Sequence, residues 1–196
     1  EVTGATGVIL VSAWQCGENV FYALYSDGTL RLNGSGATYD YDTDNRSPFY
    51  KNATVQNITV FSGITKIGND IFANCDNLKT AALPNTVTSI GDAALAIFED
   101  TMGVVRGLEK ITIPAGIKSI GKWAFAGTKL TEITIPASVI EIGDYVFRDC
   151  IKLKTARVES SLIGSFMFAC QPESAEPMRK QLKITRRRTD YGNLKT

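Results

Sequence analysis

Apolar and polar residues alternate in six-residue segments that recur along this chain. The segments begin at Val55, Leu78, Leu108, Leu130 and Leu153. The steps between them are 23, 30, 22 and 23 residues, so the base period is 22–23 residues and the second step contains an insertion of about seven. Because the alternation is rich in β-branched residues, it predicts one short strand with a buried face in each copy.

A second motif follows each of the first four segments. Pro closes three of them, at residues 84, 114 and 136, and ends the strand because it cannot donate a ladder hydrogen bond. Val/Ile-x-x-Ile-Gly comes next and predicts a second short extended piece, closed by a turn at Gly68, Gly91, Gly121 or Gly143. An apolar residue four positions after each Gly predicts one or two helical turns packed on the core. These residues are Phe72, Leu95, Phe125 and Phe147.

Stacking of the copies explains how such short units can form a core. One unit cannot bury its apolar edge alone, whereas stacked units share a continuous interior. The repeat therefore predicts an α/β solenoid, with a parallel sheet on one face and short strands and helical turns on the other. Before the repeats, Asp27-Gly28 lies between two β-rich segments and predicts a hairpin.

The pattern divides the chain into three parts. We expect residues 1–54 to form a β-hairpin capping module and residues 55–170 to hold about five repeats of 22–23 residues, with an insertion near 96–107. Residues 171–196 should hold an incomplete last rung, with a strand at Leu182–Thr185, and a basic C-terminal tail.

The segment Ile133–Cys150 reads I-T-I-P-x-x-V-x-x-I-G-x-x-x-F-x-x-C. This pattern resembles the BspA-like leucine-rich repeat family of bacterial and protist surface proteins, over residues 55 to about 170. The resemblance implies a secreted or cell-surface protein that binds a host extracellular-matrix or cell-surface protein, or another bacterial surface component. The insertion, the absence of Pro at Glu159 and a shortened fifth copy before Gly164 depart from the pattern.

Composition argues against several classes of function. The formal net charge is +1, so no overall field attracts nucleic acid. The chain has no His, which removes Ser-His-Asp and Cys-His catalysis and every His-ligated metal site. The longest aliphatic run, Val8–Val11, is far shorter than the roughly 20 residues of a transmembrane helix. We therefore expect no enzyme activity, no cofactor, no metal, no nucleic-acid partner and no transmembrane segment.

The cysteines could suggest disulfides or a metal site, but their spacing argues otherwise. Cys75 and Cys150 occupy the same repeat position three rungs apart, or roughly 15 Å at the strand spacing of a sheet. A disulfide needs Cα atoms within about 7 Å. Cys170 lies one rung beyond Cys150 with a parallel side chain. We expect buried, unpaired thiols that act as small apolar fillers; Cys16 lies outside the ladder and is not placed by this argument.

Two clusters of charged residues have both a functional and a plain interpretation. Asp40, Asp42 and Asp44 have the spacing of the first half of an EF-hand loop, but the Gly and Glu that complete it are missing. A solvated loop with Asx turns is the favoured interpretation. The basic cluster within residues 179–188 could hold an anionic surface, and a solvated strand edge and tail is favoured.

Two aspartates directly follow a repeat Gly. They are Asp92 and Asp144. A carboxylate at the start of a helical turn can accept hydrogen bonds from the free N–H groups there, so we expect both to be structural caps.

The outward side chains of the predicted strands supply the candidate binding residues. One outward row comprises Thr59, Ala82, Thr112, Thr134 and Arg157, and a second comprises Asn57, Thr80, Lys110, Glu132 and Thr155. The leading interpretation is a non-enzymatic extracellular module for protein interaction or adhesion, with candidate ligand-binding residues Thr59, Lys110, Thr112, Glu132, Thr134 and Arg157. Lys110 and Glu132 stand about 4.8 Å apart in adjacent copies and can pair. Arg157 is thus the better candidate for an external acidic group.

Three other interpretations remain open. One is a carbohydrate-active enzyme or carbohydrate-binding module that uses Asp and Tyr residues of the N-terminal part. It would be favoured by a cleft lined by several of Tyr39, Asp40, Tyr41, Asp42, Phe49 and Tyr50. The others are a purely structural spacer within a larger surface protein and a strand face that has no partner.

Overall fold

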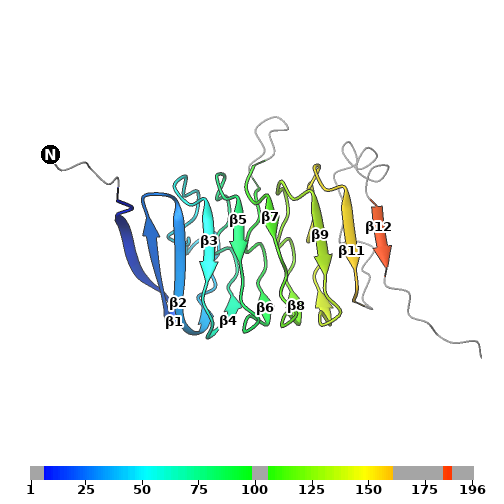
Figure 1. The fold of residues 1–196 in the computed structure, drawn as a ribbon, viewed down its shortest axis with the longest axis horizontal. Coiled ribbons are helices and arrows are strands. Elements are labelled where there is room, and N and C mark those ends of the chain that lie inside the picture. Colours follow the sequence, from blue (N-terminus) through cyan, green and yellow to red (C-terminus); the bar gives the residue numbers. More distant parts are fainter. Residues whose placement is uncertain (1–6, 99–105, 161–182, 187–196) are drawn as a thin grey trace, which may run out of the picture.

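The rungs of the solenoid stack along the long axis of the molecule (Figure 1), and four of the described rungs contain both a front strand and a lower strand. The computed structural model describes residues 7–98, 106–160 and 183–186. The front strands are β3 (Asn57–Val60), β5 (Thr80–Ala82), β7 (Lys110–Ile111), β9 (Glu132–Ile135), β11 (Thr155–Val158) and β12 (Lys183–Arg186). The lower strands are β4 (Ile64–Ile67), β6 (Ser89–Ile90), β8 (Ser119–Ile120) and β10 (Glu141–Ile142).

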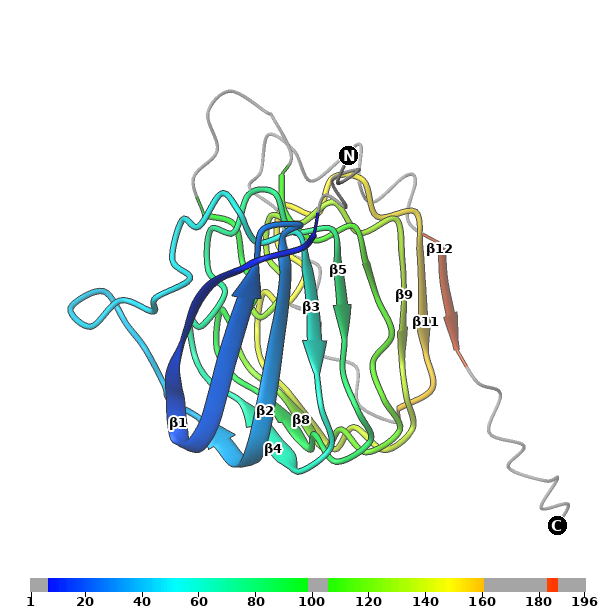
Figure 2. The same ribbon diagram turned by 60° about the vertical axis from the view of Figure 1, so that its left-hand side comes forward.

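The first two strands join the N-terminal part to this stack. β1 (Leu10–Tyr25) pairs antiparallel with β2 (Thr29–Thr38), and the Gly28 N–H donates to the Tyr25 carbonyl at 3.0 Å. The predicted hairpin at Asp27-Gly28 is therefore confirmed. β2 then pairs parallel with both β3 and β4. The N-terminal part thereby continues the front sheet and the lower sheet of the repeats (Figure 2).

β1 is itself folded back. The Ser26 N–H donates to the Ile9 carbonyl at 2.9 Å, although 16 residues of strand lie between these groups. A straight strand of that length would separate them by roughly 50 Å, so the chain reverses within β1, about midway between Ile9 and Ser26. Figure 2 shows this reversal. We call residues 9–15 the outer limb of β1 and residues 20–25 its inner limb.

The front strands pair parallel and in register, as predicted, with one exception. β3 pairs with β5, β5 with β7, β9 with β11, and β11 with β12. No described residues pair β7 with β9, although the lower strands of the same two rungs pair through Ser119↔Glu141. The prediction of one continuous front sheet is wrong at this step, because β7 is only two residues long and its ladder stops at Ile111.

The described residues contain strands and turns but no helix, so the helical turns of the predicted α/β fold are not confirmed. On this third side of each rung, which we call the turn side, Ala93 and Trp123 have positive φ values of 51° and 58°. A left-handed residue cannot continue a right-handed helix. Instead the Leu95 N–H donates to the Ala124 carbonyl of the next rung at 2.9 Å, and the Phe125 N–H donates to that of Val146 at 3.0 Å.

The apolar residues after each repeat Gly form a buried column, as predicted. Phe72, Leu95, Phe125 and Phe147 are at most 2% exposed. The rings of Phe125 and Phe147 stack with centroids 5.6 Å apart. Phe49 extends this column into the N-terminal part, where its ring lies 5.4 Å from that of Phe72.

The repeat Gly residues allow successive rungs to approach closely. A Cβ at Gly121 would lie 2.5 Å from the carbonyl carbon of Gly91, and neither residue has a positive φ. Beside them, the Asp92 carboxylate accepts from the Lys122 N–H of the next rung at 2.7 Å. Asp92 therefore caps a neighbouring rung rather than its own turn, and Asp144 makes no such described bond.

The thiols within the described residues are buried. Cys75 Sγ donates to the Phe49 carbonyl at 3.1 Å, and Cys150 Sγ donates to the equivalent Phe125 carbonyl at 3.0 Å. The two sulfurs thus have separate partners, as the rung spacing predicted. Burial raises the pKa of Cys75 and of Cys16, at the bend of β1, to about 12. Cys170 lies outside the described residues.

Candidate interaction surface on the front sheet

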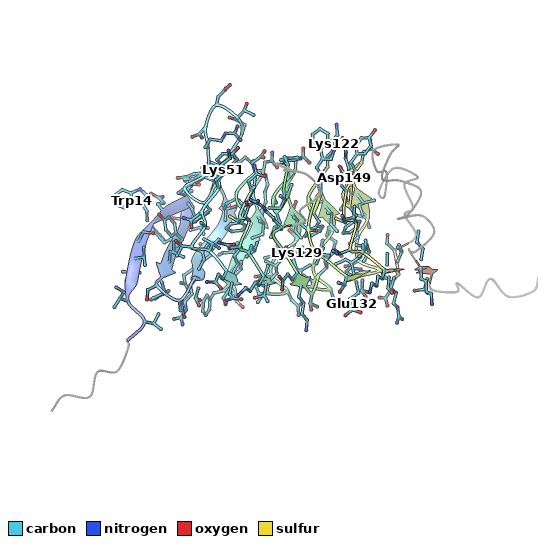
Figure 3. The ribbon with its side chains drawn as sticks, turned by 90° about the horizontal axis from the view of Figure 1, so that it is seen from above. Trp14, Lys51, Lys122, Lys129, Glu132 and Asp149 are labelled. Carbon is cyan, nitrogen blue, oxygen red and sulfur yellow. The ribbon has the colours of Figure 1, made fainter. Side chains whose placement is uncertain are left out.

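The front sheet exposes the outward rows that the repeat predicts. Register pairs Thr59 with Ala82 and Thr134 with Arg157, so these side chains share one face of the sheet. Lys110 and Glu132 are exposed on the same side. Figure 3 shows Glu132 on the front side of the molecule and Lys122 on the turn side, across the core. The surface therefore consists of short polar side chains with isolated charges.

The charged side chains of this face do not form the predicted ion pair. Lys110 and Glu132 form no ion pair within the described ranges, because their strands β7 and β9 are not adjacent members of a ladder. Arg157 contacts the Glu159 carboxylate along its own strand, with Nε and Oε1 3.0 Å apart. Its neighbour in the outward row of the adjacent rung is the uncharged Thr134, and 59% of the Arg157 side chain remains exposed.

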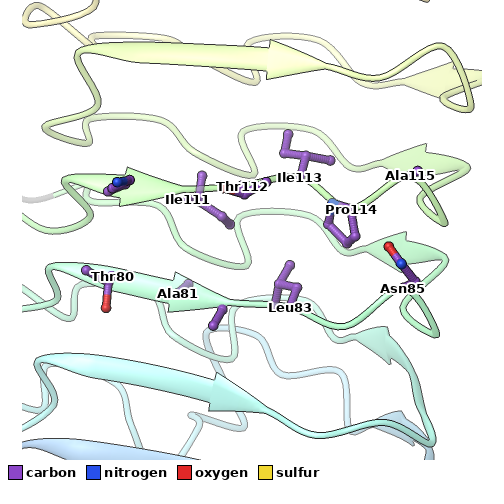
Figure 4. A pocket seen from close by; sticks show the side chains of 11 residues that line it. Thr80, Ala81, Leu83, Asn85, Ile111, Thr112, Ile113, Pro114 and Ala115 are labelled. Atoms are coloured by element: carbon purple, nitrogen blue, oxygen red, sulfur yellow. The ribbon is translucent and has the colours of Figure 1, made fainter.

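A shallow depression lies between β5 and β7 (Figure 4). The ladder joining these strands ends at Ala81↔Ile111, and the following residues of the two strands are not paired. The depression has a volume of about 470 Å³. Its apolar lining comes mainly from Leu83, Ile113 and Pro114, and the rim includes Thr80, Lys110, Thr112 and Asn85.

Two of the six candidate residues, Lys110 and Thr112, line this depression, which we call the front groove. Thr59 lies beyond the groove on β3, and the other candidates lie beyond the interruption between β7 and β9. Sequence reasoning missed the apolar residues of the groove. The second copy has Ala82 where the third and fourth have Thr, and this loss of side-chain volume in the outward row was the available signal.

Two of the N-terminal aromatic residues named in the carbohydrate interpretation lie in the core, whereas Tyr39 is exposed. Tyr41 and Phe49 are buried, and the Phe49 ring lies 4.7 Å from that of Tyr22 in an edge-on contact. Burial, with smaller contributions from Cys16 and neighbouring tyrosines, raises the pKa of Tyr41 to about 12. These side chains contribute to the core of the first rungs.

The acidic residues of the same segment have local partners. The Asp42 carboxylate accepts from the N–H groups of Asp44 and Asn45, both at 2.8 Å, which is the predicted Asx turn. Asp40 Oδ2 lies 2.7 Å from Lys66 Nζ. Desolvation would raise the pKa of Asp40, but the hydrogen bonds from Lys66 and the Asn69 N–H outweigh it, and the pKa is lowered.

The part of the chain that the structure describes contains neither a metal-binding cluster nor a membrane-spanning helix. No group of three or more Cys, Asp or Glu side chains is placed to hold a metal ion there. The same residues contain no helix that is long and apolar enough to cross a membrane. Most of the basic cluster within residues 179–188 lies outside the described residues, and β12 includes only Lys183 and Arg186 of it.

A comparison with protein-family models identifies the repeats. The model of the BspA type leucine-rich repeat region matches residues 43–102 and 103–185 and finds six copies. No curated protein matches the sequence.

Several solved structures are similar to this chain. A leucine-rich repeat protein from Eubacterium ventriosum has a TM-score of 0.58 and 29% identity, over 79% of this chain and 45% of that chain. The pneumococcal vaccine antigen PcpA has a TM-score of 0.49 and 20% identity, over 83% and 44%. A leucine-rich repeat protein from Bacteroides ovatus has a TM-score of 0.46 and 22% identity, over 86% and 51%. This chain spans about half the length of these proteins.

Proposed function

Because the chain belongs to the BspA-type leucine-rich repeat family, whose repeats generally serve as protein-interaction modules, we propose that it binds a protein partner through its front sheet without catalysing a reaction. The observation that carries this proposal is the front groove. Its apolar residues Leu83, Ile113 and Pro114 lie beside the polar rim of Thr80, Lys110, Thr112 and Asn85.

The chemistry of the groove favours a protein segment as its occupant. Protein interfaces combine an apolar centre with a polar rim, and the front groove has both. Lys110 supplies a cation at the rim. The ladder between β5 and β7 holds Thr80 and Lys110 of the rim in place, so little conformational entropy is lost at these two residues when a partner binds. We propose an extended segment with one apolar side chain directed into the groove and an acidic group near Lys110.

The place of action is proposed to be the cell surface or the extracellular space. The support is the repeat pattern itself, which resembles bacterial surface proteins. The partner is then a host matrix or cell-surface protein, or a component of another bacterial surface. Protease treatment of intact source cells, followed by detection of the chain, tests this location, and full protection from protease in intact cells would contradict it.

A matched pair of substitutions tests the front groove. Thr112→Arg places a long cationic side chain on the rim, and Thr65→Arg makes the same change at an exposed position of β4 on the lower sheet. Neither side chain is buried, so we expect similar melting temperatures for both variants. Binding to an immobilised basement-membrane matrix and to intact bacteria of a second species is the readout. Thr112→Arg should weaken attachment about tenfold or more, because the larger side chain obstructs the entrance of the groove, and Thr65→Arg should leave it unchanged.

Two results would contradict the proposal. Equal attachment of both variants and the unmodified protein would show that the front groove is not the contact surface. Failure of the unmodified protein to attach to either probe would favour the interpretation of a structural spacer.

A further inference from the structure

The outer limb of β1 is the terminal strand at the N-terminal end of the stack (Figure 2). On one side it meets the inner limb, as the Ser26-to-Ile9 hydrogen bond indicates. On the other side no described strand pairs with it. A terminal strand of this kind presents a row of N–H and C=O groups that can pair with another chain.

Exposed apolar side chains concentrate on this limb. Of the twelve large apolar side chains that are exposed within the described residues, four lie on the outer limb (Ile9, Leu10, Val11 and Trp14), and Val8 directly precedes it. Trp14 is 76% exposed and Ile9 65% exposed, and Figure 3 shows Trp14 projecting from this end of the stack. Such a cluster on a soluble protein marks an interaction surface or an aggregation hazard.

The limb lacks the features that protect terminal strands in natural sheets. Those features include charged residues, Pro and β-bulges that twist the edge away. No Asp, Glu, Lys, Arg or Pro occurs from Val2 to Gly17. The opposite end of the stack differs, because its last described strand, β12, contains Lys183 and Arg186. Two outer limbs can therefore pair through their apolar side chains. Pairing of an outer limb with β12 of another copy is less favourable, because the outer limb has no acidic residue to complement the charge of β12.

We propose that the outer limb of β1 is a homodimer interface at which two copies of this chain pair antiparallel through residues 9–15. A two-fold axis perpendicular to the sheet makes the same strand complementary to itself and satisfies the free backbone groups of both copies. Because such an axis preserves the faces of the sheet, Trp14 of one copy lies opposite Val8 or Leu10 of the other. Pairs of aromatic and aliphatic residues in this arrangement stabilise a sheet.

The interface closes after two copies. Pairing of two outer limbs uses both free edges, and the two stacks then extend in opposite directions with their front grooves unobstructed. The dimer would present two front grooves to a surface that carries several partners, which raises apparent affinity through a second, intramolecular binding event. The dimer interface does not depend on the proposed function of the front groove, since it lies at a different place on the molecule.

Substitution of two similarly exposed isoleucines tests the interface. Ile9→Lys adds a charge to the outer limb, and Ile140→Lys makes the same change at a residue that is 70% exposed beside β10. Sedimentation velocity over about 1 to 100 µM protein should give a dimer for the unmodified chain and for Ile140→Lys. Ile9→Lys should raise the dimer dissociation constant about tenfold or more, because it replaces an apolar side chain of the paired strand with a charge that must be partly desolvated, as edge lysines do in natural sheets.

Hydrogen exchange provides a second measurement that follows the backbone directly. Because Ile9 bonds to Ser26 of the inner side and backbone groups alternate sides along a strand, the Leu10 and Ser12 amides face the free edge. These amides should become more protected as protein concentration rises, in the unmodified chain but not in Ile9→Lys. A monomer at 100 µM, a dimer unaffected by Ile9→Lys, or assemblies that keep growing with concentration would each overturn the proposal. Concentration-independent protection of these amides in a monomer would show that another segment of the same chain covers the limb, and would also overturn it.

Discussion

Ala93 and Ala94 are adjacent, buried residues of the turn side that differ in backbone conformation. Ala93 has a φ of 51°, whereas Ala94 has no positive φ. A left-handed conformation costs an L-residue roughly 1–2 kcal/mol, a cost that Gly largely avoids. The same position recurs in four rungs with residues other than Gly, at Asp70, Ala93, Trp123 and Tyr145. The bonds between rungs on the turn side therefore offset repeated backbone strain.

This difference predicts that the same substitution destabilises the two positions to different extents. Ala94→Gly loses a buried methyl group and gains chain entropy in the unfolded state, so it should lower the free energy of unfolding by roughly 1–2 kcal/mol. Ala93→Gly has the same losses but relieves the left-handed strain, so its effect should be at least about 1 kcal/mol smaller. Urea denaturation followed by circular dichroism measures both values. Equal losses would contradict strain at Ala93.

The sequence predicted which residues are buried better than it predicted the backbone conformation of the turns. The position of Phe125 is fixed by its place in the repeat, and its burial follows because one face of every rung must meet the core. The positive φ of Trp123 had no comparable signal, since large aromatic residues rarely adopt that conformation. The apolar residue four positions after each repeat Gly therefore suggested helical turns. The chain instead forms turns that contain a residue with positive φ.

At the scale of the strand and its turn, the repeat Gly determines how closely two rungs can stack. An added Cβ at Gly121 meets backbone atoms of Gly91 and Asp92 at 2.5 Å, and backbone in a packed ladder cannot move independently. Gly121→Ala should therefore lower the free energy of unfolding by about 3 kcal/mol or more. Gly36→Ala is the control, because open space surrounds Gly36 and only its φ of 86° opposes a side chain.

The control separates close packing from backbone conformation. Gly36→Ala should cost only roughly 1–2 kcal/mol, the penalty for a left-handed residue. Chemical denaturation of the two variants under the same conditions gives the comparison. If Gly121→Ala costs no more than Gly36→Ala, the close approach of the rungs does not explain the repeat Gly.

The elements themselves were largely predictable, and the irregularities between them were not. The period gave the position and parallel register of β9 and β11, because each copy buries the same face. It could not give the length of β7, which depends on how the rung after the insertion meets its neighbours. The front groove depends on that short strand. A site formed by a local departure from the repeat is therefore missed by reasoning that relies on the repeat.

For the whole molecule, the interruption of the front sheet makes one junction between rungs weaker than the others. Between the rungs of β7 and β9, the described contacts include the pairing of Ser119 with Glu141 and the turn-side bond from the Phe125 N–H to the Val146 carbonyl. The front ladder present at the neighbouring junctions is missing. Because the stability of a solenoid is approximately the sum of its rungs and their nearest-neighbour interfaces, this junction is where the stack should separate first.

Hydrogen exchange at equivalent amides can detect that separation. The Lys154 N–H donates to the Thr131 carbonyl at 2.9 Å, and in the N-terminal rungs the Lys79 N–H donates to the Gln56 carbonyl at 2.7 Å. The two amides occupy the same repeat position, so local geometry does not distinguish them. In low urea, Lys154 should exchange through an opening of lower free energy than Lys79, because the rungs from β9 onward can unfold together without the rungs before them. The Glu159 amide, bonded to Ile135 across the same pair of strands, should share the opening free energy of Lys154. A gradual decrease of the opening free energy toward the C-terminus would instead indicate fraying of the end. Equal opening free energies for Lys154 and Lys79 would mean that the lower sheet and the turn side couple the whole stack without the front ladder.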